Sequence, residues 1–185
     1  MIFRCGKMIE KICKLLFEAG TLKLIPRAGW LKIGIKNPES VAEHSFRVAL
    51  ISFFLSLLEG FNFSKSCEIA FLGLIHDLHE TRTLDLHKLS KKYVKFNSNE
   101  IITEQLNLFP ETARNEILEL KKDRRIRDIV EDADKIELYL QAREYMESNP
   151  SAKLYLENLN FKTKSSVKLM KMLKKMDYRW WKEFE

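Results

Sequence analysis

The chain has 185 residues, of which 45% are hydrophobic and 31% charged, with only six glycines and four prolines. This length suits one domain around one hydrophobic core, and the composition is that of a folded globular protein rather than a disordered one. The formal charge of +6 arises from lysines in many segments and from a concentrated C-terminal tail. It predicts an attraction to anions in general, which phosphorylated small molecules satisfy as well as DNA or RNA does.

Three features of the sequence predict a cytoplasmic protein with no membrane partner. Residues 1–14 carry Glu10 among lysines and lack the apolar run and cleavage site of a signal peptide. The most apolar stretch, residues 48–58, is too short to span a bilayer. Cys5, Cys13 and Cys67 are an odd number of cysteines without a C-x-x-C pattern, which is typical of free thiols in a reducing compartment.

The first predicted helix covers residues 3–17 and ends near Gly20, because apolar side chains recur there at close to helical spacing. Residues 21–38 contain two prolines and two glycines and lack sustained periodicity, so a loop or extended passage is expected. Ser40 then opens a helix that runs to about Glu59. Ser40 and Glu43 have the spacing of a capping box, in which each side chain binds the other residue's backbone N–H.

Another helix is predicted from about residue 63 to His76 and Asp77, after a break at residues 60–62. This helix and the one that begins at Ser40 are apolar on most sides, which is typical of helices buried in the centre of an all-α domain. His44 lies in the first turns of one helix, and the His76-Asp77 pair lies at the end of the other. The polar residues of interest are therefore expected at the ends of core helices.

The second half of the chain predicts further helices. Residues 86–96, 98–108 and 111–121 have the periodicity of shorter amphipathic helices, and residues 124–147 that of a longer one, which Asn149 and Pro150 end. A final helix is predicted over residues 163–181. No segment shows the alternating pattern of a strand, so the sequence predicts an all-α fold, with residues 1–185 as a single domain that the final helix closes.

The final helix mixes lysines with apolar and aromatic side chains. A basic helix with aromatics could contact nucleic acid or a membrane surface. A helix whose apolar stripe packs on the domain while its lysines stay solvated is the commoner case. We therefore interpret it as a structural closing helix.

Two histidines and two aspartates carry the chemistry that the sequence suggests: the adjacent His76 and Asp77, His44 upstream, and Asp134 downstream. Brought together, they would give a mixed nitrogen and oxygen site, which suits a divalent ion such as Mn²⁺, Co²⁺, Fe²⁺ or Zn²⁺. Such a site indicates metal-assisted hydrolysis. Glu80 follows His76 and Asp77 at contact spacing if the helix continues, which would place another carboxylate beside the ion.

Neighbouring residues compete for these roles. Glu131 and Asp132 could each take the final ligand position instead of Asp134, because periodicity does not separate the three. His79 and His87 are interpreted as surface residues or as partners of the ligands, since four ligands already suffice.

The ordered combination of these residues resembles the HD-domain phosphohydrolases, whose signature is H…HD…D. More narrowly, it resembles the 5′-deoxynucleotidase branch of that family, over about residues 10–150. The resemblance rests on the segments Pro26-Arg27-Ala28-Gly29-Trp30, Pro38-Glu39-Ser40-Val41-Ala42-Glu43-His44-Ser45, His76-Asp77-Leu78-His79-Glu80, and Asp134. Each segment alone is a weak signal, whereas their ordered combination is specific.

The resemblance implies an all-helical HD-domain bundle, often a homodimer, with the metal site between core helices. It implies one divalent ion (Co, Mn, Fe, Zn or Mg) held by His44, His76, Asp77 and Asp134. It also implies hydrolysis of nucleoside 5′-monophosphates with a preference for deoxyribose. Matched residue by residue, Glu80 and Asp85 fall on catalytic positions. Arg27 falls on the phosphate-binding arginine, and Trp30 on the aromatic that lines the sugar site.

The sequence departs from the family pattern at two places. A glycine usually precedes the aspartate that Asp85 matches, whereas this chain has Leu84 there. In bacterial members the arginine and the tryptophan are adjacent, whereas Ala28 and Gly29 separate them here. The second departure bears on the discrimination between ribose and deoxyribose.

Two other functions stay open. The chain could be a catalytically silent nucleotide-binding regulator, or a helical module whose basic tail binds nucleic acid. The intact set of metal and acid residues argues against the first. The absence of a recognisable nucleic-acid-binding motif argues against the second.

Overall fold

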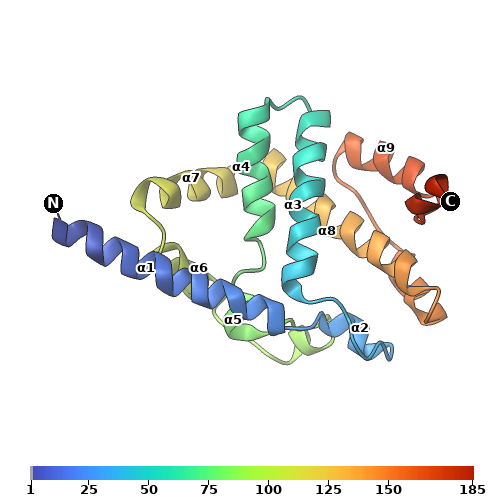
Figure 1. The fold of residues 1–185 in the computed structure, drawn as a ribbon, viewed down its shortest axis with the longest axis horizontal. Helices are drawn as coiled ribbons and strands as arrows, with labels where there is room; N and C mark the ends of the chain where they lie inside the picture. The colour runs from blue at the N-terminus through green and yellow to red at the C-terminus, as the bar shows by residue number, and fades with distance from the viewer. Residues whose placement is uncertain (1) are drawn as a thin grey trace. The chain divides into compact units, whose positions relative to one another are not determined.

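The structure, a computed structural model, describes residues 2–185, with side chains from residue 6 onward. Within this range the chain consists of α-helices and short 3₁₀ segments joined by turns, without a β-strand (Figure 1). An isolated antiparallel bridge joins Pro26 to Ser40. The predicted all-α fold is confirmed.

Connections between the helices are mostly short. The α-helices are α1 Ile2–Gly20, α2 Ala28–Lys32, α3 Val41–Leu58, α4 Phe63–Leu74, α5 Glu80–Thr83, α6 Ser98–Leu106, α7 Glu111–Lys122, α8 Arg124–Tyr145 and α9 Lys164–Leu173. The 3₁₀ segments are η1 Thr21–Leu24, η2 Ser90–Lys92, η3 Pro150–Leu156 and η4 Trp180–Phe184.

These elements belong to two compact units. The first unit comprises Met1–Phe46 and Leu74–Lys122, and the second comprises Arg47–Gly73 and Asp123–Glu185. The predicted metal ligands His44, His76 and Asp77 lie in the first unit, and Asp134 lies in the second. That residues 1–185 form a single domain stays a prediction.

An apolar cluster organises the first unit. Its buried members are Leu22, Ile25, Val41 and Leu78. Partly buried side chains from α1 and from later segments pack against them, among them Leu15, Ala19, Ile75 and Phe109. Because each fully buried aliphatic side chain contributes about 1.5–3 kcal/mol, this cluster fixes the start of α3 beside the turn that follows α4.

The start of α3 has the predicted capping box. The backbone N–H of Ser40 donates to Glu43 Oε2 at 2.6 Å, and the backbone N–H of Glu43 donates to Ser40 Oγ at 3.2 Å. Two N–H groups that the helix itself leaves without partners are thereby satisfied. The cap fixes where α3 begins and therefore where His44, in its first turns, projects.

The second unit is built on α8. Asp123 caps this helix, since its Oδ1 accepts a hydrogen bond from Arg125 N at 2.8 Å. Three isoleucines of α8 are exposed by 1% or less, namely Ile126, Ile129 and Ile136. In the same unit, Gly73 of α4 allows close approach to α3, because a Cβ atom there would lie 2.7 Å from Ser52 Oγ.

Two segments differ from the predicted helices. In residues 86–96 the structure has only η2, and Tyr93 is 80% exposed there. The final helix α9 ends at Leu173, short of the predicted residue 181. Beyond it, Asp177 Oδ1 accepts a hydrogen bond from the backbone N–H of Arg179 at 3.1 Å, a local contact that competes with helix formation.

Two more boundaries differ. The predicted loop over residues 21–38 contains η1 and the short helix α2. Helix α4 ends at Leu74, so His76 and Asp77 lie in the turn that follows it rather than at its last residues.

The expectation that α3 and α4 are buried on most sides is only partly met. Phe46 and Phe54 of α3 and Phe63 of α4 are exposed. By length and composition α3 could cross a membrane, but the core helix of a soluble protein passes the same test, and this is weak support for a span. Cys13 and Cys67 are free and exposed, whereas the side chain of Cys5 lies outside the described residues.

Candidate metal centre and active site

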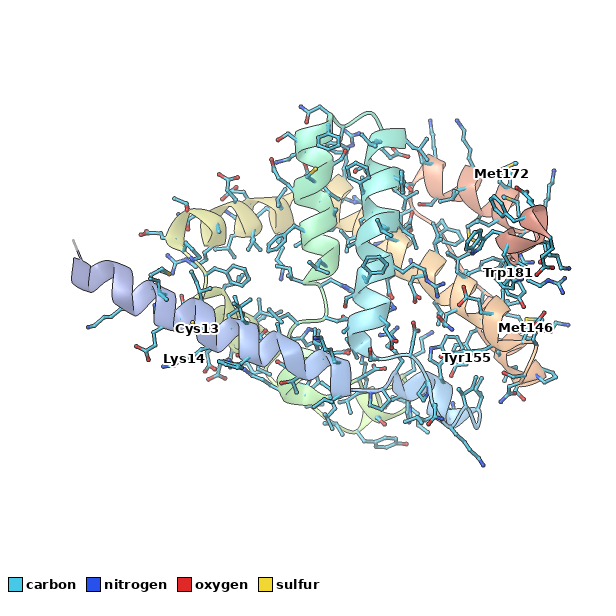
Figure 2. All side chains as sticks on the ribbon, in the orientation of Figure 1. Cys13, Lys14, Met146, Tyr155, Met172 and Trp181 are labelled. Carbon is cyan, nitrogen blue, oxygen red and sulfur yellow. The ribbon has the colours of Figure 1, made fainter. Side chains whose placement is uncertain are left out.

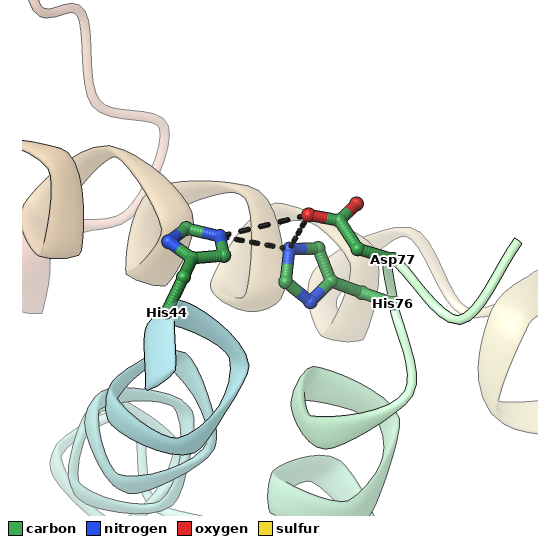
Figure 3. A group of neighbouring side chains, drawn as sticks. All are labelled: His44, His76 and Asp77. Carbon is green, nitrogen blue, oxygen red and sulfur yellow. Dashed lines mark hydrogen bonds and ion pairs between the residues drawn. The ribbon is translucent and has the colours of Figure 1, made fainter. Parts of the chain in front are cut away.

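Three of the predicted metal ligands meet in the first unit (Figure 3). His44 comes from the first turns of α3, whereas His76 and Asp77 come from the turn at residues 75–79. That turn is held in part by the backbone N–H of Glu80, which donates to Asp77 O at 2.9 Å. The His44 side chain is completely buried, and those of His76 and Asp77 are 17% and 16% exposed. The cluster is therefore fixed by the core on one side and accessible on the other.

The donor atoms of these residues converge on one point. His76 Nε2 lies 3.1 Å from Asp77 Oδ2, and His44 Nε2 lies 3.6 Å from the same oxygen and 3.4 Å from His76 Nε2 (Figure 3). Atoms that bind one ion at about 2.1 Å, at angles of about 90–109°, are about 3.0–3.4 Å apart. The triangle thus has the size of one face of a coordination sphere. Two nitrogens and a carboxylate oxygen also suit a divalent transition metal.

A guanidinium group lies beside this triangle. Arg27 Nη1 is 3.4 Å from Asp77 Oδ2. Burial alone would raise the pKa of the Asp77 carboxyl, but the neighbouring His76 and Arg27 outweigh burial and hold that pKa well below its ordinary value. Asp77 is therefore ionised, as a metal ligand must be. The backbone N–H of Arg27 donates to Glu39 O at 3.0 Å, which ties the arginine to the segment before α3.

Glu80, the first residue of α5, is only 3% exposed. Its Oε2 atom is buried and has no hydrogen-bond partner among the described residues. Burial, together with the negative charges of Asp77 and Asp85, raises the pKa of Glu80 to about 8. A carboxyl group with that pKa holds a proton at neutral pH and can exchange it with a bound molecule.

Asp85 fixes α2. Its Oδ2 atom accepts a hydrogen bond from the backbone N–H of Ala28, the first residue of α2, at 2.8 Å. Since Ala28 follows Arg27 directly, this contact also restrains the arginine. The preceding Leu84 has φ of 61° and ψ of 166°, a conformation that favours glycine and costs another residue about 1–3 kcal/mol. The turn that a glycine would make easily is therefore present here with a leucine.

Trp30 lies in the interior of the first unit rather than on an open wall. It is 1% exposed, and its Nε1 atom donates to Glu39 Oε1 at 2.9 Å. The contact between Trp30 and a sugar stays a prediction. Glu39 lies within the segment around Ser40 that carries the family resemblance, but no local pattern in the sequence predicted its contact with Trp30.

In the second unit the two acidic residues that compete with Asp134 for the fourth ligand position each form hydrogen bonds or ion pairs. The Asp132 carboxylate is completely buried and accepts hydrogen bonds from the backbone N–H groups of Lys162 and Thr163 and from Thr163 Oγ. The Glu131 carboxylate forms ion pairs with two lysines. Both carboxylates thus have structural partners. Asp134 stays the predicted fourth ligand.

The two extra histidines are not part of the triangle of donor atoms. His87 Nδ1 accepts a hydrogen bond from the backbone N–H of Leu89 at 3.2 Å, which makes it part of its own turn. Burial lowers the pKa of His79. Among the described residues, neither histidine belongs to a group of donor atoms that could hold one ion, and their roles stay a prediction.

Over residues 2–185 the chain is helical, and it brings a histidine and a His-Asp pair together where they could hold a metal ion. The HD domain model matches residues 19–177, and the chain belongs to the HD domain family.

Several known proteins resemble the chain over most of its length. The 5′-deoxynucleotidase HDDC2 of Dictyostelium discoideum is 32% identical over 148 residues, which span 73% of this chain and 74% of that protein. A crystal structure from a genomics project is 39% identical, with a TM-score of 0.82 over 93% of this chain and 99% of that one. A cyanophage S-2L HD phosphohydrolase, bound to dA and one catalytic Zn²⁺ ion, is 22% identical, with a TM-score of 0.53 over 86% of this chain and 94% of that one. The last likeness shows the fold.

Proposed function

We propose that this chain is a metal-dependent phosphohydrolase that removes phosphate from nucleoside 5′-monophosphates, with a preference for deoxyribonucleotides. The triangle of His44, His76 and Asp77 carries the proposal, because its donor atoms lie 3.1–3.6 Å apart and Arg27 lies 3.4 Å from Asp77. The substrate class is supported by the 5′-deoxynucleotidase that matches 73% of the chain.

In this proposal His44, His76 and Asp77 hold one divalent ion, with Asp134 as the fourth ligand. Two imidazoles among the donors suit Co²⁺, Mn²⁺, Fe²⁺ or Zn²⁺ better than Mg²⁺, which prefers oxygen ligands. When bound, the ion supplies Lewis-acid chemistry, since it neutralises phosphoryl oxygens and lowers the pKa of water.

The remaining residues bind the phosphate and move the proton. Arg27 offers a planar fork of donors that matches two phosphate oxygens, which a lysine would not reproduce. Glu80 would donate a proton to the leaving 5′-oxygen in its protonated form or orient the attacking water in its ionised form. Asp85 keeps its predicted catalytic role in this proposal, and its hydrogen bond from the Ala28 backbone N–H also lets it position the neighbouring Arg27.

Three finer features belong to the same proposal. Discrimination against ribose would act through Trp30, whose buried ring leaves little room for rearrangement. A homodimer is supported by the family resemblance and by the exposed apolar side chains of α3, among them Phe46 and Phe54. Light scattering of the purified protein would test the homodimer by giving the subunit number.

A cytoplasmic location is supported by the free thiols of Cys13 and Cys67.

The test is phosphate release from a panel of nucleoside monophosphates, with the protein loaded in turn with Mn²⁺, Co²⁺, Zn²⁺ and Mg²⁺. We expect cleavage of 5′-monophosphates over 3′-monophosphates, and of dAMP over AMP. His76→Ala and Asp77→Ala should lose both the metal and the activity, because each removes a donor from the triangle. His87→Ala is the matched control and should keep both, since His87 bonds to its own turn.

The outcomes separate the alternatives. Equal rates on dAMP and AMP would remove the sugar preference alone. Full metal occupancy in both His76→Ala and Asp77→Ala would overturn the ligand assignment. Nucleotide binding without phosphate release under any metal would support the catalytically silent regulator instead.

A further inference from the structure

Residues 162–185 of the second unit hold nearly all of the chain's net charge. This segment, the basic segment, contains seven lysines and one arginine against three acidic residues, a formal charge of +5 out of +6 for the whole chain. The other residues together are almost neutral. The net positive charge of the protein is therefore concentrated in one segment of the sequence, which can attract an anionic partner there.

Five of these eight cations form no ion pair with the side chains of residues 6–185. Lys162, Arg179 and Lys182 form ion pairs within the second unit. The other five are exposed lysines, namely Lys164, Lys168, Lys171, Lys174 and Lys175, of which Lys164 interacts electrostatically with Glu59 without an ion pair. Four of the five, at positions 164, 168, 171 and 175, share one face of α9 and of the turn after it, because residues three and four apart are neighbours on a helix. They form a positive row.

The other face of α9 is firmly attached to the second unit. Ser166 and Met170 are buried, and the backbone N–H of Ser166 donates to Thr163 Oγ at 3.2 Å. At the far end, Arg143 Nη1 donates to Leu173 O at 2.6 Å. The helix is held at both ends, and the positive row faces solvent.

An exposed aromatic group follows α9. Trp180 and Phe184 are 69% and 81% exposed. The ring centroids of Trp180 lie 6.1 Å from those of Phe184 and 6.2 Å from those of Trp181, and Trp181 contacts Tyr178 in turn. Exposed methionines accompany these rings, and Figure 2 labels Met172 of α9 and Trp181 of η4. Single exposed apolar side chains are common in soluble proteins, whereas a connected group of this kind marks a contact surface.

We propose that the basic segment binds the surface of an anionic lipid bilayer. The lysine row would lie against the headgroups, while the tryptophans and Phe184 enter the boundary between headgroups and acyl chains. Basic side chains next to aromatic ones are the features by which interfacial segments bind membranes. The sequence predicted no membrane partner, and this proposal departs from that prediction because these rings are exposed.

A nucleic acid is also anionic, but the rings favour lipid. Single strands are bound by aromatic faces on which successive bases stack. Here Trp180 meets Trp181 at 84° and Phe184 at 79°, so the rings cover one another edge to face instead of presenting parallel platforms. Met172 and Met176 add apolar surface that acyl chains accept and that bases do not stack on.

The proposal predicts that electrostatic attraction to the headgroups supplies most of the binding and that the rings enter the bilayer only as far as the headgroup boundary. A lysine near an anionic membrane surface strengthens binding roughly fivefold. That attraction falls off within about 10 Å at 0.1 M salt. Binding should therefore require anionic lipid and weaken as the salt concentration rises.

The experiment uses the full chain and two kinds of vesicle, phosphatidylcholine alone and phosphatidylcholine mixed with phosphatidylserine. We expect the protein to sediment only with the second kind, with tryptophan emission shifted to shorter wavelength. The triple variant Lys168→Glu/Lys171→Glu/Lys175→Glu should bind at least about 100-fold more weakly, because the loss of the three lysines alone removes three fivefold steps and the new carboxylates add repulsion. Trp180→Ala/Phe184→Ala should reduce the emission shift and weaken binding, while the salt dependence stays.

The matched control is Lys7→Glu/Lys23→Glu/Lys153→Glu, which makes the same change in net charge at exposed positions elsewhere. It should bind the vesicles within a few-fold of the parent. An equal loss in this control, or equal sedimentation with both kinds of vesicle, would overturn the proposal. A single-stranded oligonucleotide that displaces the vesicles at equal anion concentration would assign the segment to nucleic acid. An emission shift that follows protein concentration without vesicles would assign it to a second copy of the chain. Thermal unfolding of each variant shows that the fold is kept.

Discussion

Charged side chains are buried in both units, but the two units satisfy them differently. In the second unit the Arg47 guanidinium is surrounded by acceptors: Glu137 Oε1 at 2.8 Å, Glu144 Oε1 at 2.6 Å and Gln141 Oε1 at 2.6 Å. In the first unit Glu80 is almost as deeply buried as Glu137, yet its Oε2 has no partner among the described residues. The neighbouring charges that raise the pKa of Glu80 belong to the carboxylates of Asp77 and Asp85.

This difference distinguishes a structural cluster, around Arg47, from a cluster whose groups can take part in a reaction, around Asp77 and Glu80. A buried carboxylate that meets a guanidinium is already neutralised and gains little from a further cation. A buried carboxyl that meets other carboxylates keeps its proton and is poised to exchange it. The cluster around Arg47 is thus closed, whereas the cluster around Asp77 and Glu80 would be completed by an ion and a substrate.

The largest expected effect tests whether Glu80 moves a proton. Glu80→Gln keeps the shape of the side chain but cannot exchange a proton. We expect phosphate release to slow by about 10²–10⁴-fold while the metal content stays unchanged. Steady-state kinetics and metal analysis on the same samples measure both. Glu111→Gln, at an exposed carboxylate of α7, is the control, and a rate for Glu80→Gln within a few-fold of the parent would make Glu80 merely structural.

The closed cluster should respond in stability instead of activity. Arg47→Ala leaves the fully buried Glu137 without its main cation, and the free energy of unfolding should fall by about 3–5 kcal/mol. Urea unfolding measures the loss. The double variant Arg47→Met/Glu137→Leu should recover most of this lost free energy, because it removes the buried carboxylate together with its cation. A loss below about 1 kcal/mol for Arg47→Ala would show that the cluster behaves like an exposed ion pair.

The dependence of stability on pH sharpens the same contrast. In the metal-free protein the pKa of Glu80 is about 8, against 4.5 without the fold. Below pH 4.5 both states are protonated and the full stability is present. From there to pH 8 only the unfolded state releases the proton, so stability falls with rising pH by about 1.4 kcal/mol per unit. Glu80→Gln should lack this slope. Urea midpoints over the pH range decide it, and a constant difference between the two proteins would contradict the raised pKa.

The smallest expected effect concerns the backbone next to Asp85. Leu84→Gly removes strain of about 1–3 kcal/mol from a leucine that is 61% exposed, at the cost of some chain entropy, so a net gain of about 1 kcal/mol in unfolding free energy is expected. Leu89→Gly is the control, because Leu89 is 47% exposed but has an ordinary φ of −70°. It should be destabilising. Destabilisation by both substitutions would show that Leu84 is not strained.

Local sequence signals predicted the long helices well. The Ser40 and Glu43 capping box fixed the start of α3, and apolar periodicity identified α8 within a few residues of its bounds. Helix α2 was not predicted, because its first N–H is capped by Asp85, which is 57 residues away in the sequence. The helix expected over residues 86–96 did not form, since a periodic pattern gives a helix only where its apolar face is covered.

The candidate site was predictable in its members and less so in their roles. The adjacent His76 and Asp77 indicated a metal site, and the structure brings His44 to them within 3.6 Å. The burial of Trp30 and the missing partner of Glu80 Oε2 depend on tertiary packing, which no local pattern encodes. Asp85 likewise could not be recognised as the cap of α2 from its neighbours in the sequence.

The hydrogen bonds at Asp132 mean that the end of this chain is not a detachable tail. Its buried carboxylate accepts from Lys162 and Thr163, which lie at the start of the basic segment. Truncation before residue 162 would strand a negative charge in the interior of α8, two residues from the predicted ligand Asp134. A shortened protein would therefore lose stability, and it would also lose metal affinity if the change reaches the proposed ligand Asp134. A loss of phosphatase activity in such a protein would not test membrane binding. Substitutions on the surface of the basic segment are therefore compatible with the fold as long as Lys162 and Thr163 keep their hydrogen bonds to Asp132.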